Sequence, residues 1–248
     1  MKIFALSDLH LSFSCPEKSM NAFGGSWTDH HIAVKNHWNT TVSPDDYVCI
    51  AGDITWASSL QKANLDLQWI DTQLNGHKII SKGNHDYWWS SKKKLKELQL
   101  LSITFVDKEY VSLSDSVHIC AMRYSEDIAI SYNDYIEWSG SGFSKRSQKE
   151  ESELLLQHEK EIQRLSRLLT LGNKLVGTKI CMLHYPPIGP EGVKTQASEL
   201  LSLYGINHCI FGHIHALKSG LVSFPGTTPL QYHLTSCDYL NNTPTRII

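Results

Sequence analysis

The chain has 248 residues, 41% of them apolar, and a formal net charge of -2 at pH 7. This composition excludes a disordered chain and allows one sizeable core, so we expect a single domain spanning residues 1–248. A charge so close to zero provides no broad basic field, and therefore neither nucleic acid nor an anionic membrane is an expected partner.

The first residues are expected to be part of the fold and not a targeting segment. The apolar run at 3–6 meets Ser7 and Asp8 at once, which makes it too short for the core of a secretory signal. No transmembrane segment is evident. Four of the six cysteines, at 49, 120, 181 and 209, lie in strand-like runs where a thiol acts as a small hydrophobe. We therefore expect a reduced, cytoplasmic protein.

The first half of the chain alternates between strand and helix patterns. KIFALSD at 2–8, DYVCIAGD at 46–53 and HKIISKGN at 77–84 predict strands. A weak helix pattern precedes the second strand, a helix capped by Ser58 or Ser59 follows it, and a lysine-rich helix begins at about Ser90. The helix positions are Val34 and Trp38 in the first, Leu60, Ala63, Leu67, Ile70 and Leu74 in the second, and Leu95 and Leu98 in the third. This alternation favours an α/β layered fold.

The second half begins with a hairpin pattern from 105 to 122, which would make the sheet mixed. A long amphipathic helix is predicted from Ser147 to Leu171. TKICMLHY at 178–185, NHCIFGHIH at 207–215 and LVSFPG at 221–226 predict further strands.

Several predicted strands end in side chains that bind metals. The residues concerned are Asp8 and His10, Asp53, Asn84, His184, and His213 and His215. Ligand sites in open α/β sheets gather at the carboxyl ends of strands, so we expect these side chains to converge on one cavity. Asp8 and His10 are two residues apart, and so are His213 and His215. In an extended strand end, residues at this spacing point to the same side, so we expect each pair to bind one ion. Glycines before Asp53, Asn84 and His213 would allow a close approach.

The chemistry of these donors restricts the metal. Carboxylate, imidazole and carboxamide oxygen together favour Mn²⁺, with Fe²⁺ or Zn²⁺ as alternatives, over Ca²⁺, and no nearby thiol suggests a structural zinc finger. Seven candidate ligands exceed the needs of one tetrahedral ion. Two divalent ions that share Asp53 would use them all.

Five short motifs in a fixed order carry a resemblance to a known family. They are Asp8-x-His10, Gly52-Asp53, Gly83-Asn84-His85-Asp86, the lone His184 and Gly212-His213-x-His215. In this order they resemble the signature of the calcineurin-like metallophosphoesterases, more narrowly a small bacterial-type branch of phosphohydrolases.

The resemblance implies two mixed β-sheets packed as a sandwich and flanked by helices. It also implies that Asp8, His10, Asp53 and His215 hold one metal ion, and that Asp53, Asn84, His184 and His213 hold the other. Many members carry an acidic or polar residue just after Gly-Asp, whereas Ile54, Thr55 and Trp56 follow here. That departure leaves the metal ligands intact and affects the substrate contacts.

By the same resemblance, a hydroxide bridging the two ions would attack phosphorus in line. His85 would face the substrate, where it stabilises the transition state or protonates the leaving oxygen, and Asp86 would orient His85. Without the other motifs, a lone histidine such as His184 is more often structural.

Other residues have both a functional and a structural interpretation. Tyr87, with Trp88 and Trp89, either packs beneath the site or stacks on an aromatic part of the substrate. Arg123 is a candidate phosphate contact or a surface residue, and the lysine run at 92–96 is typical of a solvated helix face. His30 and His31 border one of two loops, at 13–31 and 125–143, whose composition suggests walls or a lid over the site.

The function expected from this pattern is hydrolysis of a small phosphomonoester or phosphodiester by a binuclear metal centre. A nuclease is the alternative enzyme, weakened by the lack of a basic groove composition. A metal-stabilised scaffold without activity is the alternative from another class, and the presence of all seven ligands together with His85 argues against it. The physiological substrate and the oligomeric state do not follow from the sequence.

Overall fold

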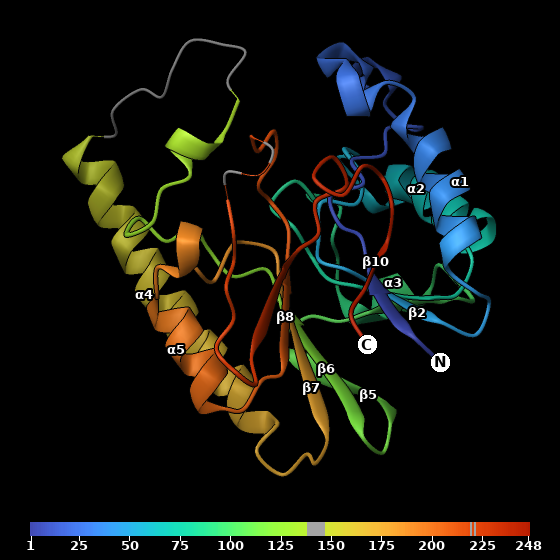
Figure 1. Cartoon of the computed structure of the whole chain (residues 1–248). Coiled ribbons are helices and arrows are strands. Elements are labelled where there is room, and N and C mark those ends of the chain that lie inside the picture. The colour runs from blue at the N-terminus through green and yellow to red at the C-terminus, as the bar shows by residue number, and fades with distance from the viewer. Residues whose placement is uncertain (138–146, 219, 221) are drawn as a thin grey trace.

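The computed structural model describes residues 1–137, 147–218, 220 and 222–248 (Figure 1). The strands in this part of the chain form two five-stranded sheets, with the orders β10-β1-β2-β3-β4 and β5-β6-β7-β8-β9. Both sheets contain parallel and antiparallel pairs, and helices flank them. The expected fold class, an α/β sandwich of two mixed sheets, is therefore confirmed.

The first sheet is built mainly from the N-terminal third of the chain. Strands β1 (Ile3–Ala5), β2 (Tyr47–Ile50), β3 (His77–Ile80) and β4 (Ile103–Phe105) run parallel to one another. Strand β10 (Thr245–Arg246) adds to the free edge of β1 in the antiparallel direction, which brings the two chain ends close together (Figure 1). The sequence predicts β1 to β3 but neither β4 nor β10, which have only three and two residues.

The second sheet begins with the predicted hairpin. Strand β5 (Glu109–Ser114) is antiparallel to β6 (Val117–Met122), and β6, β7 (Thr178–Leu183), β8 (His208–Phe211) and β9 (Gln231–Leu234) are parallel. The strand predicted at 221–226 is wrong for residues 222–226, and residue 221 lies outside the described residues. Pro225 removes a backbone donor, and a Cβ on Gly226 would lie 2.2 Å from the Leu230 carbonyl oxygen, so this segment turns before β9 begins.

Three apolar layers hold the two sheets and the helices together. The layer between the sheets includes Ile3, Cys49 and Ile79 from one side and Ile119, Ile180 and Ile210 from the other. The outer face of the first sheet, with Phe4, Val48 and Ile50, packs against helices α1 and α2. The outer face of the second sheet, with Cys120, Cys181 and Cys209, packs against α4 and α5. Alternate residues of each strand thus point into different layers.

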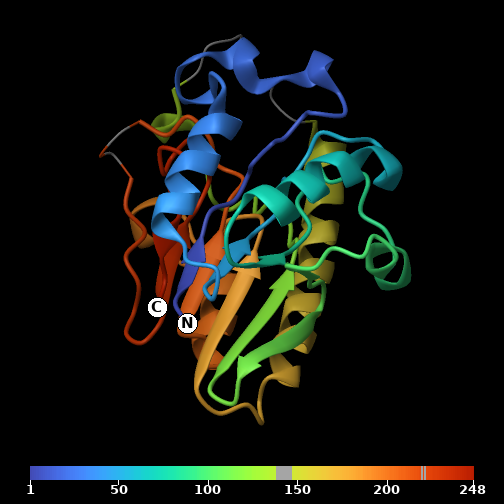
Figure 2. The same cartoon turned by 90° about the vertical axis from the view of Figure 1, so that its right-hand side faces the viewer.

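The helices occupy the two outer layers (Figures 1 and 2). Helices α1 (His30–Thr41), α2 (Leu60–Gln73) and α3 (Lys92–Lys96) lie on the side of the first sheet, and α4 (Gln148–Leu171) and α5 (Gln196–Leu203) on the side of the second. Ser59 caps α2, and Ser147 with Glu150 forms a capping box at the start of α4. Short 3-10 helices lie in the loops at Pro16–Lys18, Met20–Phe23, Gly25–Trp27, Asn133–Tyr135 and Pro190–Gly192.

Among the described helices, none combines the length and the apolar character that a membrane crossing requires.

Candidate metal centre

The seven predicted ligands come together where the parallel strands of both sheets end. Within the described residues, ligand atoms of Asp8, His10 and His215 all lie within 4.8 Å of one another. The ligand atoms of Asp8, Asp53 and His184 form a second such group. Residues far apart in the sequence are thus placed in one cluster by the shared direction of the strands.

Asp53 lies at the middle of this cluster. Its Oδ2 atom is 3.8 Å from Nε2 of His10 and 3.4 Å from Nε2 of His184. Its Oδ1 atom accepts a hydrogen bond of 2.8 Å from the His85 amide. One carboxylate oxygen therefore faces two imidazoles that belong to different ends of the cluster.

Asn84 joins the two histidines at one end. Its Oδ1 atom lies 2.6 Å from Nε2 of His184 and 2.9 Å from Nδ1 of His213. At the other end, Nε2 of His215 lies 3.2 Å from Nε2 of His10 and 3.6 Å from Oδ1 of Asp8. His213 and His215 therefore face different ends, so the expectation that this pair grips one ion is wrong. Asp8, His10 and His215 form one group, as the family resemblance implies, but Asp8 also belongs to the group of Asp53 and His184.

The backbone at four of the seven ligands adopts the left-handed region. The φ angles are 58° at Asp8, 43° at His10, 53° at Asp53 and 71° at His213. The strand ends are therefore not extended, as the spacing had suggested, but turn sharply at the ligand itself. Non-glycine residues with such angles cost free energy, and they persist where the surrounding structure holds them at functional sites.

Two glycines allow the carboxylates to reach the centre. A Cβ atom on Gly83 would lie 2.1 Å from Oδ1 of Asp53, and one on Gly212 would lie 2.1 Å from Oδ2 of Asp8. Both distances are far below van der Waals contact. The prediction that these glycines serve a close approach is confirmed.

Opposing effects set the pKa values in this buried cluster. Burial disfavours the charged forms of both Asp53 and His184, but their mutual attraction outweighs it, so the pKa of Asp53 falls well below its usual range and that of His184 rises to about 9. Burial and the nearby His184 lower the pKa of His213 to about 3. Burial is likewise outweighed at His215, whose pKa rises to about 10 beside Asp238 and Asp8. The imidazole of His213 is therefore neutral at pH 7 and has a free lone pair.

The cluster fits divalent cations. Oδ2 of Asp8 is buried and has no hydrogen-bond partner among the described residues, although its Oδ1 accepts one from the His213 amide. A buried carboxylate oxygen without a donor is costly unless a cation satisfies it. The set of carboxylate, imidazole and carboxamide donors suits borderline divalent metals.

Asp86 is fully buried beneath the centre. Its carboxylate accepts hydrogen bonds from the amides of Asp53 and Gly83, at 2.9 and 2.8 Å, and also from Ile54 and the Trp88 indole. These bonds tie the loop after β2 to the loop after β3. No bond to the His85 side chain occurs among the described residues, and the expected orientation of His85 by Asp86 is not seen.

His85 is half-buried at the edge of the centre and is surrounded by aromatic rings. Its ring centroid lies 4.4 Å from that of Trp56 and 5.8 Å from that of His10. Its Nδ1 atom has no hydrogen-bond partner among the described residues. Trp56, and not a carboxylate, therefore sets the position of this imidazole.

Two tryptophans in the wall of the site were not predicted as site residues. Trp56 stacks on His10 with centroids 4.8 Å apart, and Trp27 meets the rings of His10 and His215 edge-on at 5.9 and 5.4 Å. Trp27 comes from the loop at 13–31, which was expected to form a wall. The position of Trp56, directly after the Gly-Asp motif, was the available signal for its role.

The histidines that border this loop differ in role from the ligands. His30 is buried, and its Nε2 lies 2.8 Å from the carbonyl oxygen of Leu9. It therefore supports the backbone between Asp8 and His10 instead of entering the cluster. His31 packs edge-on against Phe13, with ring centroids 5.3 Å apart.

The candidate substrate contacts lie on the side of His184. The Arg123 carbonyl accepts hydrogen bonds from the amides of His184 and Tyr185, and the ring of Tyr185 lies 4.2 Å from that of His213. Arg123 also lines a cavity of about 440 Å³ together with Lys160 and Arg164 of α4. Part of the loop at 125–143, residues 138–143, lies outside the described residues.

The residues after the Gly-Asn-His-Asp motif divide between surface and core. Tyr87 is 65% exposed beside His85, with ring centroids 6.2 Å apart, whereas Trp88 is buried in the core. The four lysines of α3 are exposed, as expected for a solvated helix face.

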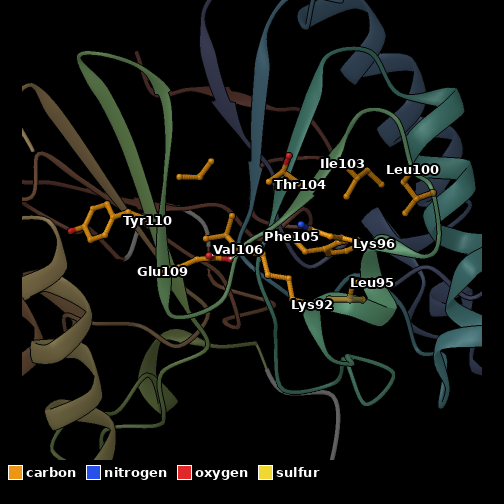
Figure 3. Close-up of a pocket in the computed structure, with 11 residues that line it drawn as sticks. Lys92, Leu95, Lys96, Leu100, Ile103, Thr104, Phe105, Val106, Glu109 and Tyr110 are labelled. Atoms are coloured by element: carbon orange, nitrogen blue, oxygen red, sulfur yellow. Dashed lines mark hydrogen bonds and ion pairs between the residues drawn. The ribbon is translucent and has the colours of Figure 1, made fainter.

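A second hollow, of about 330 Å³, lies between α3 and strands β4 and β5 (Figure 3). Lys92 crosses its rim to Glu109 with a 2.5 Å ion pair. None of the seven ligands lines it, so it is separate from the metal centre.

A comparison with known protein families agrees with the resemblance that the motifs carry. A family model described as calcineurin-like phosphoesterase matches residues 1–217. Among solved structures, a protein of unknown function from Aquifex aeolicus is 15% identical, with 99% of this chain and 95% of that chain covered and a TM-score of 0.48. The anchor protein in the inner membrane complex of Plasmodium is 10% identical, with 96% and 72% covered and a TM-score of 0.45. A comparison with the curated proteins found no significant match.

Proposed function

The chain belongs to the calcineurin-like phosphoesterase family, and from this we propose that it is a binuclear metal-dependent phosphohydrolase acting on a small phosphomonoester or phosphodiester. The observation that carries the proposal is the position of Asp53, whose Oδ2 atom faces His10 on one side and His184 on the other. This position supports the proposal that the carboxylate is shared by two ions.

The expected ligand division follows the two ends of the cluster. Asp8, His10 and His215 would hold one ion, Asn84, His184 and His213 the other, and Asp53 both. Asp8 belongs to both groups of close ligand atoms and is the alternative shared carboxylate. Manganese is the first candidate, with iron or zinc as alternatives. Two such ions, when bound, lower the pKa of water and neutralise the phosphate oxygens.

His85 is the residue that we assign to the leaving group. It is half-buried, lies between Trp56 and Tyr87, and has no carboxylate partner among the described residues. Burial, its largest influence, lowers its pKa. The lowered pKa makes the protonated imidazole a stronger acid toward a departing oxygen, although it also lowers the fraction of His85 that carries the proton at pH 7.

Arg123 and Tyr87 are the proposed substrate contacts. No hydrogen bond or ion pair joins the Arg123 guanidinium to another side chain in the part of the chain that the structure describes. It shares its cavity with two further cations on α4, although Glu153 and Glu161 also line that cavity. A substrate with a second anionic group beyond the scissile phosphate would find its counter-charge on this side of the centre.

Initial rates with added Mn²⁺ on 4-nitrophenyl phosphate and on bis(4-nitrophenyl) phosphate test this proposal, with Asp53→Ala as the blank. We expect hydrolysis of at least one ester by the wild type and at least a 100-fold lower rate for the variant. Faster cleavage of the bis-ester would indicate a phosphodiesterase, and faster cleavage of the mono-ester a phosphatase. Tight metal binding without hydrolysis of any ester in a panel of phosphoesters would instead support the alternative that the protein is a metal-stabilised scaffold without activity.

A further inference from the structure

The segment that follows β9, residues 235–238, lies beyond the part of the chain that the family model matches. It nevertheless runs directly beside the metal centre. The Cys237 amide donates to the Ser7 carbonyl and the Cys237 thiol to the Asp8 carbonyl, both at 3.0 Å. The hydroxyls of Ser7 and Thr235 lie 2.8 Å apart. The segment is therefore fixed against the loop that carries Asp8.

Asp238 ends this segment and contacts a second ligand of the same half of the centre. Its Oδ1 atom lies 2.8 Å from Nδ1 of His215, and its Oδ2 atom accepts a 2.8 Å hydrogen bond from the Ala216 amide. The carboxylate side chain is only 7% exposed. It thus holds both the ring of His215 and the backbone of the next residue, which has a positive φ of 53°.

The contact with His215 determines which ring nitrogen carries the proton. An ionised carboxylate only accepts hydrogen bonds, so Nδ1 of His215 must be the donor. The Nε2 atom, which faces Asp8 and His10, is then the nitrogen that gives up its proton when a metal ion binds and that offers its lone pair to the ion.

The other half of the centre uses a different partner for the same purpose. Nδ1 of His184 lies 2.9 Å from the carbonyl oxygen of Ala51. Nδ1 of His10, by contrast, is buried without a hydrogen-bond partner among the described residues. Among the described residues, His215 is therefore the candidate ligand histidine of the Asp8 half whose Nδ1 atom has a hydrogen-bond partner.

We propose that Asp238 is a positioning residue of the metal centre, which fixes the tautomer and the orientation of His215 and thereby sets the metal affinity of the Asp8, His10 and His215 half. This inference rests on the metal centre of the proposed function. Loss of such an outer partner typically weakens metal binding about 10- to 100-fold.

The test is a titration of metal-free protein with Mn²⁺ by calorimetry, comparing the wild type with Asp238→Asn. The amide has nearly the same shape but would present a donor to Nδ1 of His215 if its oxygen keeps the Ala216 contact. We expect one of two ions to bind about 10- to 100-fold more weakly and the other to bind as in the wild type. Asp115→Asn, an exposed substitution in the turn between β5 and β6, is the matched control and should bind both ions normally.

A measurement on the wild type keeps the proposal testable if Asp238→Asn does not fold. Nitrogen NMR of the Zn²⁺-loaded protein should show the proton of His215 on Nδ1 and the metal on Nε2. The opposite tautomer, or an Asp238→Asn variant that binds both ions with wild-type affinity, would overturn the proposal. Because neither readout needs turnover, a wild type that binds two ions but hydrolyses nothing would refute the function and leave this inference standing, and a wild type that binds no metal would refute both.

Discussion

His85 differs from its neighbours in the motif because, among the described residues, its side chain has aromatic ring contacts and no hydrogen bond. The rings of Trp56, His10 and Tyr87 surround it, and the neighbouring Asn84 and Asp86 side chains face other partners. Its removal should therefore disturb neither the metal ligands nor the loop beneath them.

We predict that His85→Ala keeps its bound metal but loses about 100-fold or more in kcat on a phosphoester with a poor leaving group, such as an alkyl phosphate. The loss on 4-nitrophenyl phosphate should be clearly smaller, since nitrophenolate departs without a proton. Steady-state kinetics on both substrates, with metal content measured for each preparation, checks this. His77→Ala, an exposed histidine at the start of β3, is the control.

Equal losses on the good and the poor leaving group would rule out the acid role and leave a purely electrostatic one. A loss of metal in His85→Ala would mean that the variant has damaged the centre.

The individual candidate ligands could be predicted because each stands within a few residues of the end of an apolar run in the sequence. The partners of these ligands could not. Trp27, Trp56 and Asp238 reach the centre from a loop, from the residues after a motif and from the C-terminal segment, and only the position of Trp56 after the Gly-Asp motif offered a local signal. The sequence predicted that Asp86 orients His85, whereas its carboxylate accepts hydrogen bonds from backbone amides. The positions of these amides are defined only in the folded chain.

At the scale of elements, Asp86 joins two strand ends. The loop after β2 carries Asp53, the loop after β3 carries Asn84, and the Asp86 carboxylate accepts bonds from amides of both. All observed hydrogen-bond partners of the Asp86 carboxylate are donors. An amide in its place would therefore direct its own NH₂ group at one of these donors.

We predict that Asp86→Asn destabilises the protein by about 2 to 4 kcal/mol, because at least one buried amide loses its acceptor and an NH₂ group is added against a donor. It should also weaken metal binding, since both Asp53 and Asn84 depend on these loops. Chemical denaturation and metal titration of the same preparations measure the two effects. Asp71→Asn is an informative comparison, because its carboxylate likewise accepts from the Leu101 and Ser102 amides but far from the centre, so it should lower stability without changing metal affinity. If Asp86→Asn bound metal with wild-type affinity, Asp86 would not be needed to hold the two ligand-bearing loops in place.

Most strand positions followed the hydrophobic pattern of the sequence, including the partly exposed β5. Strands β1 to β3, the β5–β6 hairpin, β7 and β8 were found where their apolar runs predicted them. The failures are short or partly exposed strands. Strand β9 has only one buried residue, Leu234, and its position is set by pairing with β8 and not by its own sequence. The turns at the ligands were also not predictable, because positive φ at aspartate and histidine is imposed by the surrounding structure.

At the scale of the whole molecule, a histidine pair between the two last strands of the second sheet contributes a pH dependence that is separate from the metal centre. Nδ1 of His208 on β8 lies 3.1 Å from Nε2 of His233 on β9. Burial lowers the pKa of both, and the additional repulsion from His208 brings that of His233 to about 4. Between pH 6.5 and 4 the unfolded chain therefore binds a proton at this position that the folded chain does not.

Stability from this pair is fully present above pH 6.5 and falls as the pH drops toward 4. We predict that the wild type loses about 1 to 2 kcal/mol more than His233→Gln between pH 7 and pH 5. Urea denaturation at a series of pH values measures the difference, with His77→Gln as the exposed control. Parallel curves for the wild type and His233→Gln would show that the pair is not responsible.

The proposed function requires one cluster that holds two ions with Asp53 between them. The most direct measurement is anomalous diffraction from crystals of the wild type grown with Mn²⁺. We expect two peaks, one beside His10 and His215 and one beside Asn84, His184 and His213, with the Asp53 carboxylate in contact with both. A single peak, a pair of peaks that Asp53 does not touch, or no peak at this cluster would contradict it.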